Sequence, residues 1–481
     1  MSKNTKENNS FYGLKSSALS PLEVLSQSIA NIAPTASPTV VIPLVFAAAG
    51  NATWIAYAFA VIGMLFVSAN INVFARRSAS PGSIYTYIAE GLGPSWGVAI
   101  GWILFVAYVA CASSVTTGFT NYFNVLLKDI FGFEGISPAA SVGILSLGVL
   151  AAWYVAYKDI QLSTRLILGI EFIAVLLTLA IVALTIFNNG FKADIPQFTL
   201  EGVSSEGIRL GLVLAMFSFV GFESATALGG EAKNPLKSIP SAVRRSVILV
   251  GALFIISSYA EVLGFRGNEI GLDQSDAPLQ VLSAKANVPI LGKIITAVAI
   301  VSFFACVLAS ITAGARVLFL MARHGVFPKV FAKAHNKNQT PHITTLLAAV
   351  LAFLPAAILT GLGNNLFSIY GWIGTTTTLS FIVSYIAVSI AAPIYLKRRG
   401  ELKRRNIINS AISVILLGMV LIGTVSPFPT DEYRYFVYAF IVLLAFGLIL
   451  GAYAGHRAPI KGKITRGVEE IRQRFSDGDG I

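Results

Sequence analysis

The sequence predicts an all-α integral membrane protein with twelve transmembrane helices, and three observations lead to this fold class. Of its 481 residues, 55% are hydrophobic and 12% are charged, whereas soluble domains carry about 25% charged residues. The mean hydropathy is +0.74. The third observation is a series of apolar stretches, each long enough to cross a bilayer at about 20 residues per crossing. The predicted spans lie near residues 23–49, 52–75, 94–127, 138–157, 165–187, 207–231, 241–265, 291–322, 342–361, 366–396, 407–427 and 433–456.

The basic residues are distributed unevenly around these spans. Most of the 35 Lys and Arg residues, Arg316 among them, fall on the side that holds both terminal tails. Cytoplasmic loops carry such an excess, so we expect a multi-pass protein of the cell membrane, surrounded by lipid, with both termini in the cytoplasm. The same asymmetry accounts for the net charge of +12, and nucleic acid is therefore excluded as a partner.

We make three further predictions for segments outside the spans. Residues 80–97 predict a short helix before the third span, and residues 267–289 are expected to cover the mouth of a pathway. The end of the chain, from residue 462, is charged and rich in glycine, and is expected to be flexible beyond a short helix. The first apolar stretch is too long for a signal peptide and has no cleavage site, so we expect it to be retained.

The residues that carry enzyme chemistry are sparse. Cys111 and Cys306 both lie within apolar stretches, which favours neither a disulfide framework nor a zinc site. The four histidines match no metal-binding spacing. Because no phosphate-binding loop or catalytic triad spacing appears either, we expect no enzyme activity, no metal and no cofactor.

Two of the predicted spans are interrupted. Pro34, Pro38 and Pro43 occur close together in the first span, and proline removes a backbone donor and breaks a helix. The sixth span contains Gly221 and, two residues later, the carboxylate of Glu223. Four continuous spans follow each broken one, so the chain divides into two halves of opposite orientation. Interrupted segments at corresponding positions of two such halves are typical of a transporter site.

The predicted organisation is a cytoplasmic tail at 1–20, a first repeat at 21–190, a second repeat at 206–396, two further spans at 406–457 and a cytoplasmic tail at 458–481.

Several segments resemble the amino acid–polyamine–organocation (APC) superfamily. The run FSFVGFESATALGGEAKNPLKSIPSAV at 217–243 resembles its sixth span, and RVLFLMARHGVFP at 316–328 resembles the end of its eighth. GSIYTY and the later Gly101-Trp102 are similar to its second loop and third span. The resemblance implies a bacterial-type amino acid permease with a LeuT-type 5+5 inverted repeat and two extra C-terminal helices. The sequence departs from the family at APTAS, where many members have a glycine-rich run, and at His324, where an acid is common.

The break in the first span predicts a carboxylate site. A half-helix that starts within the membrane directs its positive dipole end and its unpaired N–H groups at an anion, and Thr35 and Ser37 add hydroxyl groups. The resemblance assigns the substrate carboxylate to Thr35, Ala36 and Ser37, and the substrate amine to carbonyls such as that of Ile32. The alternative is a proline-kinked helix with a purely structural role.

The break in the sixth span predicts the amine-facing side of the same site. Gly221 permits unusual backbone dihedrals and close approach, and the carbonyls of Phe217 and Val220 are candidates to accept hydrogen bonds from an ammonium. The resemblance makes Phe217 an aromatic lid, and an aromatic ring attracts a cation. The alternative is that Phe217 only packs against its neighbours.

Two intramembrane carboxylates are candidates for coupling or pH sensing. For Glu223 we weigh substrate pairing, proton transfer and capping of the second half-helix, and we favour capping combined with sensitivity to protonation. For Glu171, a proton carrier and a helix-packing hydrogen bond are weighed equally. Glu261 lies near the external end of its span and is expected to extend towards water.

Pocket walls are expected from the third, eighth and tenth spans. One expected wall segment runs from Val109 to Ala112, and the other runs from Thr375 to Thr378. Ser310 is also placed near the first break by the resemblance. Ser310 and Thr312 are candidate sodium ligands, although bonding between helices is the favoured role for such side chains.

The function we predict is a secondary transporter that moves amino acids by alternating access, with H+ coupling or exchange favoured over Na+ coupling. A polyamine or amino-alcohol permease is the nearest alternative, and a non-transporting amino-acid sensor is the alternative of another class. The substrate, the coupling ion and the oligomeric state are left open by the sequence.

Overall fold

A computed structural model describes residues 11–132, 136–158, 160–275, 277–426, 428–429 and 431–476. Within these residues every regular element is helical, and the one backbone bridge of β type joins Leu19 to Ala232. The α-helices are α1 (Pro21–Ile32), α2 (Ile42–Ala49), α3 (Thr53–Ala75), α4 (Ile84–Leu92), α5 (Pro94–Phe131), α6 (Pro138–Lys158), α7 (Ile160–Asn188), α8 (Ile195–Thr199), α9 (Ser205–Phe217), α10 (Pro235–Gly264), α11 (Pro278–Lys285), α12 (Pro289–Arg323), α13 (His342–Gly361), α14 (Leu366–Arg398), α15 (Arg404–Val425), α16 (Tyr433–His456) and α17 (Ala458–Ser476). Short turns of other helical types are η1 (Phe11–Gly13), η2 (Ser37–Val41), η3 (Gly50–Ala52), η4 (Ser224–Leu228), η5 (Leu272–Gln274) and η6 (Lys329–Ala332).

Ten helical segments in the described part of the chain are long and apolar enough to cross a membrane. The first two predicted spans lie in one of these segments, Pro21–Ala75, where short turns connect α1, α2 and α3. The sixth predicted span is not among the ten, because its helix, α9, ends after 13 residues. The difference from twelve therefore arises at the two predicted breaks, and the protein is a multi-pass membrane protein.

Local signals in the sequence explain where several helices begin. Ser20 precedes α1 and forms a capping box with Glu23, in which each side chain accepts a hydrogen bond from the other residue's backbone N–H. Asn365 caps α14 in the same position. Proline occupies the first turn of α5, α10 and α12, where the missing N–H is not needed.

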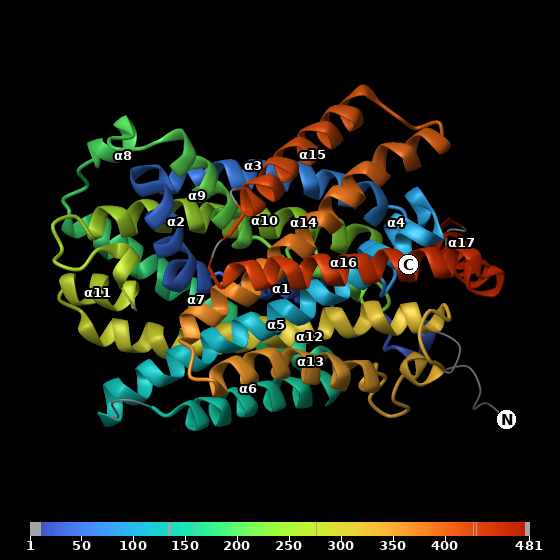
Figure 1. The fold of residues 1–481 in the computed structure, drawn as a ribbon, viewed down its shortest axis with the longest axis horizontal. Helices are drawn as coiled ribbons and strands as arrows, with labels where there is room; N and C mark the ends of the chain where they lie inside the picture. The colour runs from blue at the N-terminus through green and yellow to red at the C-terminus, as the bar shows by residue number, and fades with distance from the viewer. Residues whose placement is uncertain are drawn as a thin grey trace.

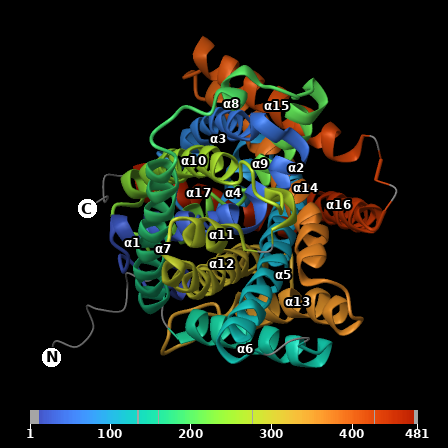
Figure 2. The same ribbon diagram turned by 90° about the vertical axis from the view of Figure 1, so that its left-hand side faces the viewer.

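The long helices α5 and α12 pack against each other in the middle of the molecule (Figures 1 and 2). Helices α6 and α13 lie together on one flank, and α3, α10 and α15 lie on the other side of α5 (Figure 2). Helices α8 and α11 are at one end of the long axis, while α4 and α17 are at the other (Figure 1).

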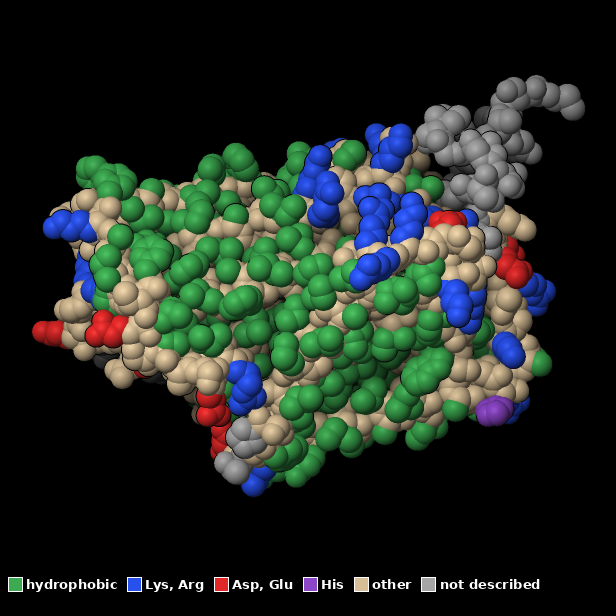
Figure 3. Space-filling view, turned by 90° about the horizontal axis from the view of Figure 1, so that it is seen from above, with side chains coloured by type: hydrophobic (Ala, Val, Ile, Leu, Met, Phe, Trp, Pro, Cys, Tyr) green, Lys and Arg blue, Asp and Glu red, His purple; other side chains and the backbone are tan. Residues whose placement is uncertain are grey.

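Hydrophobic and basic side chains occupy different parts of the surface that Figure 3 shows. Hydrophobic side chains cover its middle, and Lys and Arg side chains gather towards the end that carries α17 (Figure 3). An apolar belt of this kind is what a membrane-spanning bundle presents to lipid.

The segments outside the spans agree only in part with the predictions made from the sequence. The short helix expected within residues 80–97 is confirmed as α4. The helix expected in the C-terminal tail is α17, which at 19 residues is longer than a short helix, and the residues after Ser476 lie outside the described part of the chain. Arg316, which we had counted with the loop charges, lies within α12 and is buried.

Candidate functional site

The backbone breaks at both predicted places. Helix α1 ends at Ile32, and Ala33 has a left-handed backbone with φ of 52°. The chain resumes helical form in the π-helical turn η2, from Ser37. Helix α9 ends at Phe217, and Gly221 follows with φ of 78°, a value that glycine adopts without the steric cost paid by other residues. The chain then forms only the short 3-10 turn η4.

The two broken segments touch each other. Ser224 donates its hydroxyl hydrogen to the Gln27 carbonyl over 3.0 Å, and the Ala225 N–H donates to the Ser28 hydroxyl over 3.2 Å. Gly221 packs directly against the Asn31 side chain, so that a Cβ at 221 would overlap the Asn31 amide. The absence of a side chain at Gly221 therefore allows the two breaks to meet.

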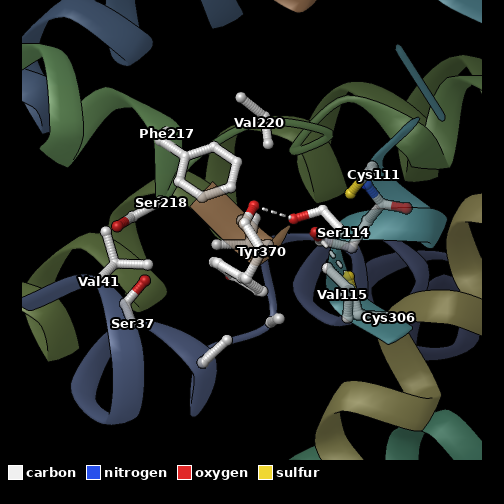
Figure 4. Close-up of a pocket in the computed structure, with 14 residues that line it drawn as sticks. Ser37, Val41, Cys111, Ser114, Val115, Phe217, Ser218, Val220, Cys306 and Tyr370 are labelled. Atoms are coloured by element: carbon white, nitrogen blue, oxygen red, sulfur yellow. Dashed lines mark hydrogen bonds between the residues drawn. The ribbon is translucent and has the colours of Figure 1, made fainter. Parts of the chain in front are cut away.

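A pocket opens between these breaks (Figure 4). Its walls come from both broken segments and from α5, α12 and α14, with the Tyr370 side chain below Phe217 in this view. The lining residues are Asn31, Ile32, Ala33, Ala36, Ser37, Val41, Cys111, Ser114, Val115, Phe217, Ser218, Val220, Cys306 and Tyr370. All of these residues are uncharged, and most are apolar.

Five predicted binding residues line the pocket: Ile32, Ala36, Ser37, Phe217 and Val220. The Phe217 ring meets the Tyr370 ring nearly edge-on, with centroids 5.8 Å apart. The Phe217 carbonyl accepts the Val220 N–H over 3.3 Å, so it is not a free acceptor as we had expected.

The other predicted binding residues lie outside the pocket lining. Thr35 is fully buried beside it, with a hydroxyl that has no partner in the described part of the chain. The Gly221 N–H donates to the Tyr385 hydroxyl over 2.9 Å. Ser310 donates to the Asn31 side-chain carbonyl over 3.0 Å, which is the favoured role of bonding between helices. Thr375 donates to the Gly371 carbonyl within its own helix.

Helical phase explains the misplaced wall residues. On α5 the pocket takes one face of the helix. Cys111 lies on this face and within the expected segment, whereas Val109 and Ala112 do not line the pocket and Ser114 and Val115 do. On α14 it takes Tyr370, more than one turn before Thr375. Periodicity cannot set this phase when a helix is apolar all round, because no polar face marks its outer side.

Asn31 is the polar residue that sequence reasoning missed. Its backbone carbonyl accepts the Cys306 thiol over 3.4 Å, and its side-chain nitrogen has no partner among the described residues. Since buried donors are nearly always satisfied, an unpaired amide facing a pocket marks a place for a ligand acceptor. The signal was present as an asparagine directly before the first break.

The capping role predicted for Glu223 was wrong. Glu223 precedes η4 but makes no capping hydrogen bond with its side chain. Tyr108 on α5 donates to one carboxyl oxygen over 2.7 Å, and Tyr385 on α14 donates to the other. Glu223 is fully buried and lies outside the pocket lining. It ties the sixth-span break to α5 and α14.

Glu171 on α7 is buried and accepts the Ser302 hydroxyl at both carboxyl oxygens, over 3.0 and 3.2 Å. Ser302 lies on α12, so this contact corresponds to the helix-packing alternative. Glu171 also lines a second cavity, between α1, α7 and α10, whose other lining side chains are apolar except Ser26.

Residues 23–458 match the family model described as amino acid permease. The chain belongs to this family. The match confirms the resemblance to the APC superfamily. Because the members of this family are transporters, the chain is a permease.

Three relatives illustrate the range within the family. The branched-chain amino acid permease BcaP of Bacillus subtilis is 23% identical over 372 residues, which cover 74% of this chain and 76% of the relative. The serine/threonine exchanger SteT of the same species is 25% identical over 320 residues, covering 64% and 70%. The low-affinity putrescine importer PlaP of Escherichia coli is 27% identical over 312 residues, covering 62% and 66%.

Proposed function

We propose that this chain is a secondary active transporter that moves neutral amino acids across the cytoplasmic membrane by alternating access. The observation that carries the proposal is the uncharged pocket between two broken helices. The ends of half-helices near the middle of a bundle can bind the charged carboxylate and ammonium groups that all amino acids share. Charged side chains are not needed for this. BcaP and SteT are named as carriers of neutral amino acids, which supports the same substrate class.

The carboxylate of the substrate would lie at the first break. Ser37 lines the pocket, the Thr35 hydroxyl is unpaired among described residues, and the start of η2 adds a positive helix end. The unpaired Asn31 amide supplies a further donor. The amine would take the carbonyls of Ile32 and Val220, beneath Phe217 as the lid.

The arrangement around this site would be the LeuT-type 5+5 inverted repeat with two additional helices, α15 and α16, after it. The gathering of Lys and Arg at the end that carries α17 supports a cytoplasmic location for both tails (Figure 3). We also propose coupling to protons in preference to Na+.

Polyamine transport is the second candidate, favoured by the similarity to PlaP. A dication requires acidic partners in its site, since a buried unpaired charge is costly. The pocket has none: Glu223 lies outside the lining, and both of its oxygens already accept tyrosine hydroxyls. The pocket therefore favours the neutral amino acid.

Purified protein in liposomes tests the proposal. Vesicles loaded with unlabelled substrate would be assayed for counterflow of radiolabelled alanine, serine, leucine, lysine, glutamate and putrescine, with empty liposomes as the control. We expect counterflow of neutral amino acids alone. Counterflow of putrescine in their place would favour the polyamine alternative, and no counterflow of any compound would support a non-transporting sensor.

The lid role of Phe217 is tested by Phe217→Ala. Losing the ring opens the pocket to water and removes its edge-on contact with Tyr370, so we expect the counterflow rate to fall by about tenfold or more at unchanged expression. Phe59→Ala is the matched control, because Phe59 on α3 is 49% exposed. Equal rates for both variants would remove Phe217 as a lid.

A further inference from the structure

Glu261 on α10 is a buried acid that the substrate site does not use. Its side chain is fully buried, and neither carboxyl oxygen has a hydrogen-bond partner among the described residues. Our expectation that it extends to water was wrong. Leu282 of α11 and Thr185 of α7 pack against Gly264, less than one turn further along, and cover this end of α10.

An ionised carboxylate in this position would be expensive. Buried charges in proteins are paired, and a charge in a membrane span without a partner costs several kcal/mol by common estimates. The nearby Ser257 hydroxyl, one turn earlier on α10, is also without a partner in the described chain. The carboxyl oxygens of Glu261 and the hydroxyl of Ser257 are thus buried polar atoms without hydrogen-bond partners among the described residues, and a carboxyl oxygen of Glu261 is free to hold a proton.

Other charged groups on the elements packed against α10 have hydrogen-bond partners other than Glu261. Glu23 on α1 pairs with Arg165 on α7 over 2.9 Å, and Lys285 on α11 donates to the Gly264 carbonyl over 2.8 Å. Glu171 on α7 is bonded to Ser302. Helix α3 carries no charged residue, and Tyr57 is one of its titratable groups. Among the described residues, Glu261 thus forms neither an ion pair nor a hydrogen bond with a cation.

Tyr57 connects the helix of this acid to the substrate pocket. It is buried on α3, and its ring packs against the Phe254 ring of α10 with the centroids 5.6 Å apart. Its hydroxyl lies 3.0 Å from the Ser218 hydroxyl, directly after α9. Ser218 and Ser37 line the pocket from the two broken segments. A single phenol thus joins the sixth-span break to α10, the helix that carries the unpaired carboxyl.

We propose that Glu261 is the proton-carrying residue of this transporter and that Tyr57 links its protonation to occupancy of the pocket. The inference rests on the proposed function. One proton adds to a carboxylate oxygen on the outer side and returns to water on the inner side, with no other bond changed. A substrate that takes the Ser218 hydroxyl removes a partner of Tyr57, and Tyr57 passes this change to α10, on which Glu261 lies.

The test compares Glu261→Gln with Glu171→Gln in liposomes, using the neutral amino acid that gives the strongest counterflow. We expect Glu261→Gln to keep counterflow within about twofold of wild type. Accumulation driven by an alkaline interior, and acidification inside on adding substrate, should fall by about tenfold or more. Glu171→Gln should retain both responses, and Tyr57→Phe should weaken them while keeping the ring.

The outcomes separate this inference from the proposed function. Absence of counterflow in the wild type would contradict transport itself. Counterflow with accumulation driven by a sodium gradient alone would overturn a proton-carrying Glu261 and leave transport intact. Normal proton-driven accumulation by Glu261→Gln, or its loss in Glu171→Gln alone, would also overturn the inference.

Discussion

Gly221→Ala is expected to lower the counterflow rate by at least about tenfold. The backbone at 221 has φ of 78°, and an L-residue there costs about 1–2 kcal/mol. The added methyl group would also overlap the Asn31 amide. That amide lines the pocket, and its oxygen accepts the Ser310 hydroxyl. The substitution therefore displaces a pocket residue as well as straining the break.

Gly169→Ala is the matched control for this variant. Gly169 lies within α7, and nothing approaches within 4 Å of the Cβ that it would gain. Alanine in a helix is favoured over glycine by about 1 kcal/mol, so we expect wild-type counterflow and unchanged or higher thermal stability. A Gly221→Ala protein that transports at the wild-type rate would contradict the account of the paired breaks.

Arg316→Met is expected to destabilise the protein by about 3–5 kcal/mol, because it leaves the buried Glu231 carboxylate without its partner. Arg316 and Glu231 are 2% and 0% exposed and approach to 2.5 Å. The Glu231 carbonyl also accepts the N–H groups of Ala18 and Leu19, over 2.8 and 3.0 Å. The ion pair thus joins α12 to the segment after η4, and the two backbone hydrogen bonds join that segment to the chain that leads into α1.

The measurement is the thermal unfolding midpoint of the purified protein in detergent, which should fall by several degrees. The double variant Arg316→Met with Glu231→Met removes both charges, and such replacements of buried pairs are often neutral or stabilising. We therefore expect the double variant to recover most of the lost stability. A single variant as stable as wild type would show that Glu231 finds another partner.

The sequence was most informative where an effect is local to the backbone. Pro34, Pro38 and Gly221 act on the dihedrals of their own segments, so both breaks were predicted to within a few residues. The charge asymmetry and the apolar stretches likewise depend on residue type alone, and they identified a multi-pass protein. The family resemblance then placed Ile32, Ala36, Ser37 and Phe217, and the break at Gly221 placed Val220. All five residues line the pocket.

Side-chain roles that depend on distant partners were not predictable in this way. The pocket faces of α5 and α14 depend on helical phase, which an apolar helix does not encode by periodicity. Glu223 looked like a cap until Tyr108 and Tyr385, from helices far away in sequence, were found to occupy both its oxygens. Asn31 acquires its importance only through Gly221, Ser310 and Cys306.

The sequence by itself thus determined the class of protein and the two places where helices break, since composition, proline and glycine exert these effects without tertiary contacts. Only the tertiary structure decided which acids are partnered. Glu171 and Glu223 are each bonded across helices, while Glu261, which we had placed at the water, is enclosed and unpaired among the described residues. Burial and pairing are properties of the packed bundle, because each depends on side chains that come together only when the helices do.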